Sequence, residues 1–182
     1  MKSKVFFNPA FMVFTVLMGL AGVLPPTIAS AAPANFLLDN PDWKESEAPP
    51  PPAFDVGKLQ TFTVTANQFM VYGVDPGSIS ISSSDSVVRY VVVATSQSGV
   101  RNIMYEALQC ARGEVKTYAR MAPGGQWQPV KDPQWRSVFE KTPSMHALAF
   151  AKLAACDAAA PATSVPEIVF KLKNAGVYRD NF

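Results

Sequence analysis

The stretch SVVRYVVVATSQSGVRNIMYEALQCARGEVKTYAR, residues 86–120, decides the fold of this chain. Its first segment, residues 87–96, is apolar almost throughout, which is typical of a central strand with both faces covered. Turn-forming residues at 97–99 and at 111–114 separate this segment from two further strand-like segments. The stretch therefore predicts three consecutive strands of an antiparallel sheet.

The segments before this stretch extend the same pattern. Phe62 and Val64 alternate with threonines, as expected of a half-buried strand. A second strand follows, then an Asp-Pro-Gly turn at residues 75–77, and then Ile79 and Ile81 alternate with serines. We therefore expect an antiparallel β-meander that begins near the start of the region 59–182.

The turns also predict a register between the strands. If Thr95 lies opposite Val100 across the first turn, then Arg89 lies opposite Glu106. This placement predicts a structural ion pair between Arg89 and Glu106 within an otherwise apolar face. A slip by one residue would exchange the two faces of each strand.

The other face of these strands carries aromatic and basic side chains, if Cys110 also lies opposite Val115 across the second turn. Tyrosine and arginine are enriched at binding hot spots, because they combine a large contact area with hydrogen bonding. We therefore predict a binding face here. The alternative is a second small core, in which Trp43, Trp127 or Trp135 packs over the tyrosines. The candidate residues are Tyr90, Tyr105, Tyr118, Arg101 and Arg120, with Lys116 beside them.

Helical signals follow the predicted sheet. Thr142 suits a helix N-cap and Pro143 the first helical position, and alanines continue the pattern. Ser164 and Glu167 form a capping-box pattern before a last helix, and Gly176 lies near its end. The predicted fold class is α+β, an antiparallel β-meander with one or two C-terminal helices.

Residues 1–31 predict a secretory signal peptide. Lys2 and Lys4 precede an apolar run, and a small-residue Ala-Ser-Ala motif ends at Ala31. The apolar run is shorter than the roughly 20 residues of a membrane-spanning helix, so an uncleaved anchor is only the alternative. We expect cleavage after Ala31 or Ala32, export to the periplasm or cell envelope, and no stable membrane span afterwards.

The charge and the length of the mature chain restrict its possible partners and its number of domains. The 182 residues include 16 basic and 14 acidic residues, and cleavage of residues 1–31 removes two lysines and no acid. The mature net charge is therefore zero, and no strong field remains to attract nucleic acid. The length suits one domain, which we place at residues 59–182.

Residues 32–58 predict a proline-rich N-terminal arm. The four prolines from Pro49 to Pro52 favour an extended polyproline II conformation and exclude regular sheet pairing. Trp43 and Phe54 are candidate anchors of this arm on the domain. A disordered linker is the alternative.

The chain has two cysteines, Cys110 and Cys156. An exported protein meets an oxidising compartment, and both cysteines lie on apolar faces of their predicted elements. We therefore expect a disulfide that links the sheet to a helix. A free catalytic thiol is the alternative, and it would need an activating base.

Few features of the sequence favour catalysis. His146 is the only histidine and falls at the edge of the apolar stripe of its predicted helix. One histidine with two cysteines is a poor zinc set, and the sequence has no nucleophile elbow, P-loop or dinucleotide-binding motif. We therefore predict no metal, no cofactor and no catalytic residue. A small periplasmic hydrolase that uses His146 for proton transfer is the alternative.

Several short motifs occur together along the mature chain. They are Asp42-Trp43-Lys44-Glu45, Val88-Arg89-Tyr90, Asn102 with Tyr105-Glu106, Cys110 with Gly113-Glu114, Lys116-Thr117-Tyr118-Ala119, Trp127 and Trp135-Arg136. In this combination the sequence resembles the cryptic neisserial protein-like family, exported bacterial proteins with no established activity. The resemblance covers the chain from Asp42 to Cys156 and departs before Cys156, where Leu-Ala-Ala replaces aromatic residues. It implies the class and the compartment of the protein, but no activity.

The order of elements also has a second, weaker similarity. It runs from Tyr72 through the turn at residues 75–77 and a long apolar strand to Cys110, Trp127 and Cys156. This order is similar to that of the surface-adhesin protein E family. The similarity implies a compact sheet with a cysteine crosslink and, by analogy, a ligand-binding surface.

These observations favour an uncharacterised exported domain that acts as a non-enzymatic binding or interaction module. Its partner would be an envelope protein or a surface ligand rather than nucleic acid. A surface-exposed, adhesin-like protein is the alternative hypothesis.

Overall fold

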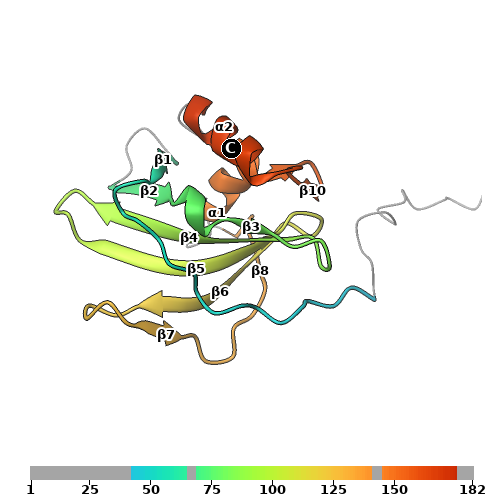
Figure 1. The fold of residues 1–182 in the computed structure, drawn as a ribbon, viewed down its shortest axis with the longest axis horizontal. Coiled ribbons are helices and arrows are strands. Elements are labelled where there is room, and N and C mark those ends of the chain that lie inside the picture. Colours follow the sequence, from blue (N-terminus) through green and yellow to red (C-terminus); the bar gives the residue numbers. More distant parts are fainter. Residues whose placement is uncertain (1–41, 65–68, 141–144, 176–182) are drawn as a thin grey trace, which may run out of the picture. The chain divides into compact units, whose positions relative to one another are not determined.

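The fold is built around one antiparallel sheet (Figure 1). The computed structural model describes residues 42–64, 69–140 and 145–175. Within them the strand order is β1-β2-β4-β5-β6-β7, with β3 paired to β4 and β8 paired to β6. The strands are β1 (Gln60–Phe62), β2 (Met70–Val74), β3 (Ser80–Ile81), β4 (Val87–Ser96), β5 (Arg101–Gln109), β6 (Glu114–Met121), β7 (Trp127–Pro129) and β8 (Arg136–Ser137).

Strand β4 is the centre of this sheet. It pairs with β2 and β3 along one edge and with β5 along the other. Because successive side chains point to opposite faces, Tyr90 and Val92 enter one core whereas Val91 enters another. The expectation that this apolar segment is covered on both faces is confirmed.

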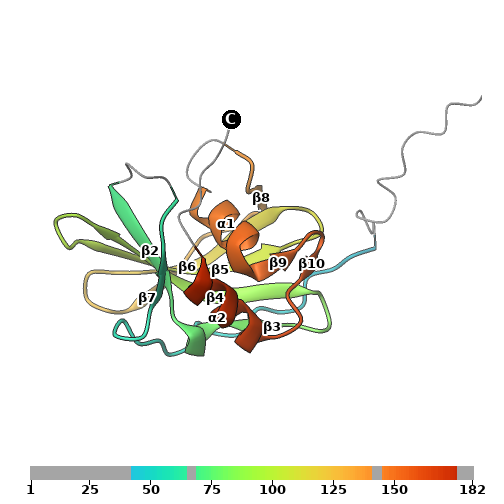
Figure 2. The same ribbon diagram turned by 90° about the horizontal axis from the view of Figure 1, so that it is seen from above.

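Two helices cover one face of the sheet, as Figures 1 and 2 show. Phe150 and Ile168 from these helices are fully buried against Tyr90 and its neighbours in the larger core. The elements are α1 (Met145–Phe150), a π-helical turn (Ala151–Ala155), the short strands β9 (Cys156–Asp157) and β10 (Ala160–Pro161), and α2 (Val165–Asn174). The α+β class with C-terminal helices is therefore confirmed.

The disulfide joins this helical layer to the sheet. Cys110 follows β5, Cys156 follows the π-helical turn, and their Cα atoms are 5.7 Å apart. The predicted pairing is confirmed, and the alternative of a free catalytic thiol is wrong. The disulfide therefore fixes the end of the helical segment that begins with α1.

The arm, residues 42–58, lies across the opposite face of the sheet (Figure 1). Phe54 packs edge-on against Trp127 with ring centroids 6.0 Å apart, and Trp43 packs against Trp135 at 5.8 Å. Both predicted anchors therefore hold the arm on the sheet.

The predicted register of the first hairpin is wrong by one residue. Thr95 pairs with Arg101 rather than with Val100. The cause is a three-residue loop, 97–99, in which Gly99 adopts a left-handed conformation with φ +84°. Three-residue hairpin loops commonly need glycine at this position.

This slip separates Arg89 from Glu106. Arg89 lies opposite Ala107 and Glu106 lies opposite Tyr90, so the two charged side chains point to different faces. The predicted Arg89–Glu106 ion pair is therefore wrong. Arg89 pairs instead with Asp85, at 2.7 Å between Nη2 and Oδ2.

The second hairpin also departs from the predicted register. Leu108, not Cys110, lies opposite Val115, and further along β6 carries a β-bulge at Tyr118. An extra residue in one strand reverses the alternation of the side chains that follow it. Arg120 therefore points to the helix-covered face and not to the face of Tyr118.

The second helix begins as predicted. The Oγ of Ser164 accepts a hydrogen bond from the backbone N–H of Glu167, at 3.3 Å. The glutamate side chain completes the cap by accepting from the backbone N–H of Thr163. Other predicted features lie outside the described residues: the signal peptide at 1–31, the cap residues Thr142 and Pro143, and Gly176.

Candidate functional site

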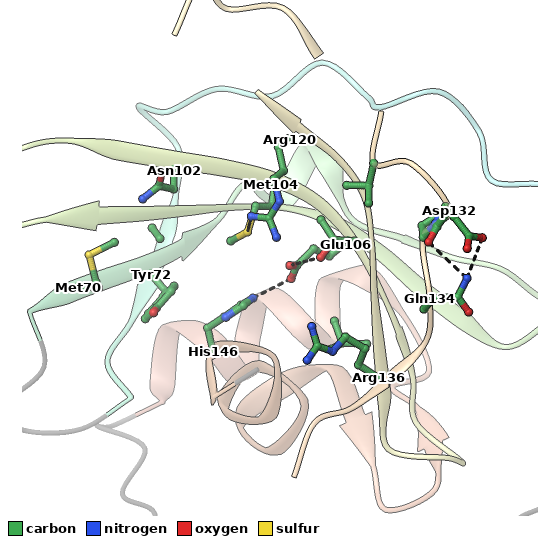
Figure 3. A pocket seen from close by; sticks show the side chains of 15 residues that line it. Met70, Tyr72, Asn102, Met104, Glu106, Arg120, Asp132, Gln134, Arg136 and His146 are labelled. Carbon is green, nitrogen blue, oxygen red and sulfur yellow. Dashed lines mark hydrogen bonds and ion pairs between the residues drawn. The ribbon is translucent and has the colours of Figure 1, made fainter. Parts of the chain in front are cut away.

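A pocket of about 590 Å³ lies on the helix-covered face of the sheet (Figure 3). Strands β2, β4, β5 and β6, the segment 130–136 and helix α1 contribute side chains to it. Its volume is within the range of small-molecule pockets, about 300–1,000 Å³. The lining residues are Met70, Tyr72, Ala94, Asn102, Met104, Glu106, Val115, Thr117, Arg120, Val130, Asp132, Pro133, Gln134, Arg136 and His146.

A buried pair of titratable residues lies at the centre of this lining. The Nε2 of His146 is 2.8 Å from Oε2 of Glu106, and both side chains are almost completely buried. Tyr90 donates its hydroxyl to the same carboxylate at 3.2 Å, and Thr117 donates to it at 3.1 Å. The carboxylate therefore has three side-chain partners from three elements of the fold.

These partners keep Glu106 ionised. Burial raises the pKa of its carboxyl, but His146 and the two hydroxyls outweigh burial and hold this pKa below the ordinary value of 4.5. An ionised carboxylate only accepts hydrogen bonds, so the proton between the two residues is on Nε2 of His146. The pair therefore presents an oriented imidazole to the pocket.

Tyr72 fixes the plane of this imidazole from the other side. Its ring stacks on that of His146, with centroids 5.1 Å apart and an angle of 14° between the planes. Burial, together with the nearby charge of Glu106, raises the pKa of the Tyr72 hydroxyl. Tyr72 is therefore a neutral side chain at physiological pH.

Two arginines complete the charged lining. Figure 3 shows Arg120 and Arg136 entering the pocket from different walls. The Nη1 of Arg120 donates to Sδ of Met104 at 3.1 Å, whereas Arg136 pairs with Glu140 at 3.3 Å. Both arginine side chains are solvent-exposed, so both are accessible to a ligand.

One wall is the irregular segment between β7 and β8. Asp132 has a left-handed backbone conformation with φ +52°, which aspartate tolerates better than most residues. Its carboxylate accepts a hydrogen bond from the side-chain amide of Gln134 at 2.8 Å. This bond stabilises the local conformation of the segment.

The predicted binding face is divided between the two faces of the sheet. Tyr90 is fully buried in the helix-side core, whereas Tyr105 is buried in the core under the arm. Arg101 is exposed but does not line the pocket, and Arg120 does line it. The prediction that Tyr90, Tyr105 and Arg120 share one face is therefore wrong, because the register slip and the β-bulge each exchange faces.

The tyrosines under the arm form a second small core, which is the alternative to the predicted binding face. Tyr105 and Tyr118 pack together with ring centroids 5.3 Å apart. The Tyr118 hydroxyl donates to Glu45 of the arm, and Lys116 pairs with the same carboxylate at 2.7 Å. Burial and the contact with Glu45 raise the pKa of Tyr118. This surface is therefore occupied by the chain itself.

The sequence indicated only part of the pocket. His146 and Arg120 were singled out individually, but the pairing of His146 with Glu106 depends on contacts between segments far apart in the chain. The wall formed by Asp132 and Gln134 contains the Asp132-Pro133 step, which indicates a turn and nothing about a site. Among the described residues, no group of three or more His, Cys, Asp or Glu is placed to hold a metal ion.

Fold and site together define a disulfide-linked α+β domain with a ligand-sized pocket between its sheet and its first helix. Residues 38–173 match the CNP1-like family, and the chain belongs to this family. No curated protein and no solved structure matches the chain significantly. In the part of the chain that the structure describes, no helix combines the length and the apolar character needed to cross a membrane.

Proposed function

We propose that this protein is an exported, non-enzymatic binding protein of the cell envelope, and that its ligand occupies the pocket around His146. The observation that carries the proposal is the convergence of Arg120, Arg136 and the His146–Glu106 pair on one pocket of about 590 Å³. The signal-peptide features of residues 1–31 support export. A disulfide suits an oxidising compartment.

Hydrogen bonding in the pocket favours binding over chemistry. The Nε2 proton of His146 is donated to Glu106, and the Thr117 hydroxyl is donated to the same carboxylate. The pKa of Glu106 lies below its ordinary value because of these contacts, so this carboxylate is a weak base and activates Thr117 poorly as a nucleophile. Oriented donors and an apolar lining are the usual features of a binding pocket.

A hydrolase that uses His146 is the second candidate function. The 2.8 Å contact between His146 and a carboxylate favours it, because many catalytic histidines are oriented by a carboxylate. Such an enzyme would convert its ligand, and a His146→Ala variant would lose the conversion.

We expect the protein, when purified from its own cell envelope, to carry a small molecule that is detected by native mass spectrometry. An Asn102→Trp variant should lose this adduct, because Asn102 is an exposed lining residue and an indole there would occupy part of the space available to the ligand. Arg101→Trp is the matched control. It adds the same side chain to the preceding residue of β5, outside the pocket lining, and should keep the adduct.

Equal adducts in both tryptophan variants would contradict the proposed site. A chemically altered product, present only when His146 is intact, would favour the hydrolase. Protease added to intact cells separates two locations: a periplasmic protein is protected, whereas the surface-exposed, adhesin-like alternative is degraded.

A further inference from the structure

We infer that the pocket takes a small molecule with one carboxylate and an apolar body, and that Arg120 binds the carboxylate. This inference rests on the proposed function, because it specifies the ligand of the same pocket. It follows from the position of Arg120, the charges of the lining and the distribution of its apolar side chains.

Arg120 differs from Arg136, the other arginine of the pocket lining, in its ion pairing. Within the described residues Arg89 pairs with Asp85 and Arg136 pairs with Glu140, whereas no carboxylate lies within ion-pair distance of Arg120. The β-bulge in β6 turns its side chain into the pocket. A guanidinium binds a carboxylate through two parallel hydrogen bonds, which gives both affinity and orientation.

The remaining charges favour a singly charged anion. Glu106 is ionised, but its carboxylate already accepts hydrogen bonds from His146, Tyr90 and Thr117. Asp132 adds a second negative charge to the lining, and the charge of Arg136 is already paired with Glu140, so Arg120 is left to balance the charge of a ligand. A carboxylate, with one negative charge, therefore fits this lining better than a phosphate monoester.

The apolar part of the lining is placed to receive the rest of the ligand. Met104 contacts Arg120 directly, and Met70, Tyr72 and Val130 contribute further apolar surface to the same pocket. Methionine side chains adapt to ligands of irregular shape, because they are unbranched and polarizable. A carboxylate held by Arg120 would therefore leave its carbon chain in contact with this surface.

The test is calorimetric titration of the mature protein with octanoate, octyl phosphate, 1-octanol and octylamine. These probes share a chain of eight carbon atoms in total and differ in the head group. We expect octanoate to bind, and each of the other three to bind about tenfold more weakly or not at all. Arg120→Gln should weaken octanoate binding by about tenfold or more, and Arg120→Lys should weaken it less.

Arg101→Gln is the matched control, because Arg101 is an exposed arginine on the neighbouring strand and does not line the pocket. It should bind octanoate as the unchanged protein does, and equal melting temperatures would show that both glutamine variants fold. The inference is wrong if octanoate does not bind, if octanol or octyl phosphate binds as tightly, or if Arg120→Gln has no effect. The proposed function has a separate test, since the adduct lost in Asn102→Trp does not depend on octanoate.

Discussion

Replacement of Asp85 by alanine is expected to lower the free energy of unfolding by about 3–5 kcal/mol, because it leaves Arg89 buried without its partner. The side chain of Asp85 is fully buried and that of Arg89 is 3% exposed. Asp85 also accepts a hydrogen bond from the backbone N–H of Ser46 at 2.9 Å. The variant therefore also loses a hydrogen bond between the arm and the domain. Unfolding in urea, followed by tryptophan fluorescence, measures the loss.

Glu140→Ala is the matched control for this variant. It removes the partner of Arg136, another arginine paired with an acidic residue four positions away, but both side chains of this pair are about half exposed. Exposed ion pairs contribute about 0–1 kcal/mol, so this variant should be close to the unchanged protein. An equal loss of unfolding free energy in the two alanine variants would contradict a stabilising role of the buried Asp85–Arg89 pair.

The same pair predicts how stability depends on pH. Although burial raises the pKa of Asp85, its contacts with Arg89 and Ser46 hold this pKa well below the ordinary value of 3.8. The unfolded chain therefore binds the proton first, so the stabilisation is complete above pH 3.8 and is lost as the pH falls further. Asp85→Ala should show a shallower loss of stability over this acid range.

Removal of the disulfide is the second large effect. With a separation of 46 residues between Cys110 and Cys156, the chain-entropy relation assigns the crosslink about 4 kcal/mol. The variant that carries both Cys110→Ala and Cys156→Ala should therefore unfold at a much lower urea concentration. Mass spectrometry under non-reducing conditions should find the unchanged protein two hydrogens lighter than its dithiol form.

The disulfide also supports the pocket, because the helical segment that contains His146 ends at Ala155, directly before Cys156. In the variant without cysteines, amide hydrogen exchange should increase first in residues 145–155, and only later in β4 and β5. A stability within about 1 kcal/mol of the unchanged protein would contradict this role of the crosslink. Treatment of the unchanged protein with a reducing agent is the control and should give the same loss.

The fold class was predictable because it depends on local patterns. The alternation around Phe62, the apolar segment of β4, the cap at Ser164 and the two cysteines each specify a feature without knowledge of the rest of the chain. The order of β4, β5, β6 and β7 then follows from the short turns between them.

The face of each strand was not predictable in the same way. It depends on the length of the loop that contains Gly99 and on the β-bulge at Tyr118, and each shifts the pairing by one residue. Because side chains alternate, the first change placed Tyr90 instead of Arg89 beside Glu106, and the second moved Arg120 into the pocket. The sequence draws attention to His146 and to Glu106 separately, but it does not predict that the two residues pair.

The central claim is that the functional site of this protein is the pocket around His146 and Glu106, and the methionine methyl groups test it most directly. Met70 and Met104 line the pocket, whereas Met121 at the end of β6 does not. With carbon-13-labelled methyl groups, a small-molecule extract of the cell envelope should shift the NMR signals of Met70 and Met104 and leave that of Met121 unchanged. An extract that binds the protein but shifts only Met121, or neither pocket signal, would contradict the account.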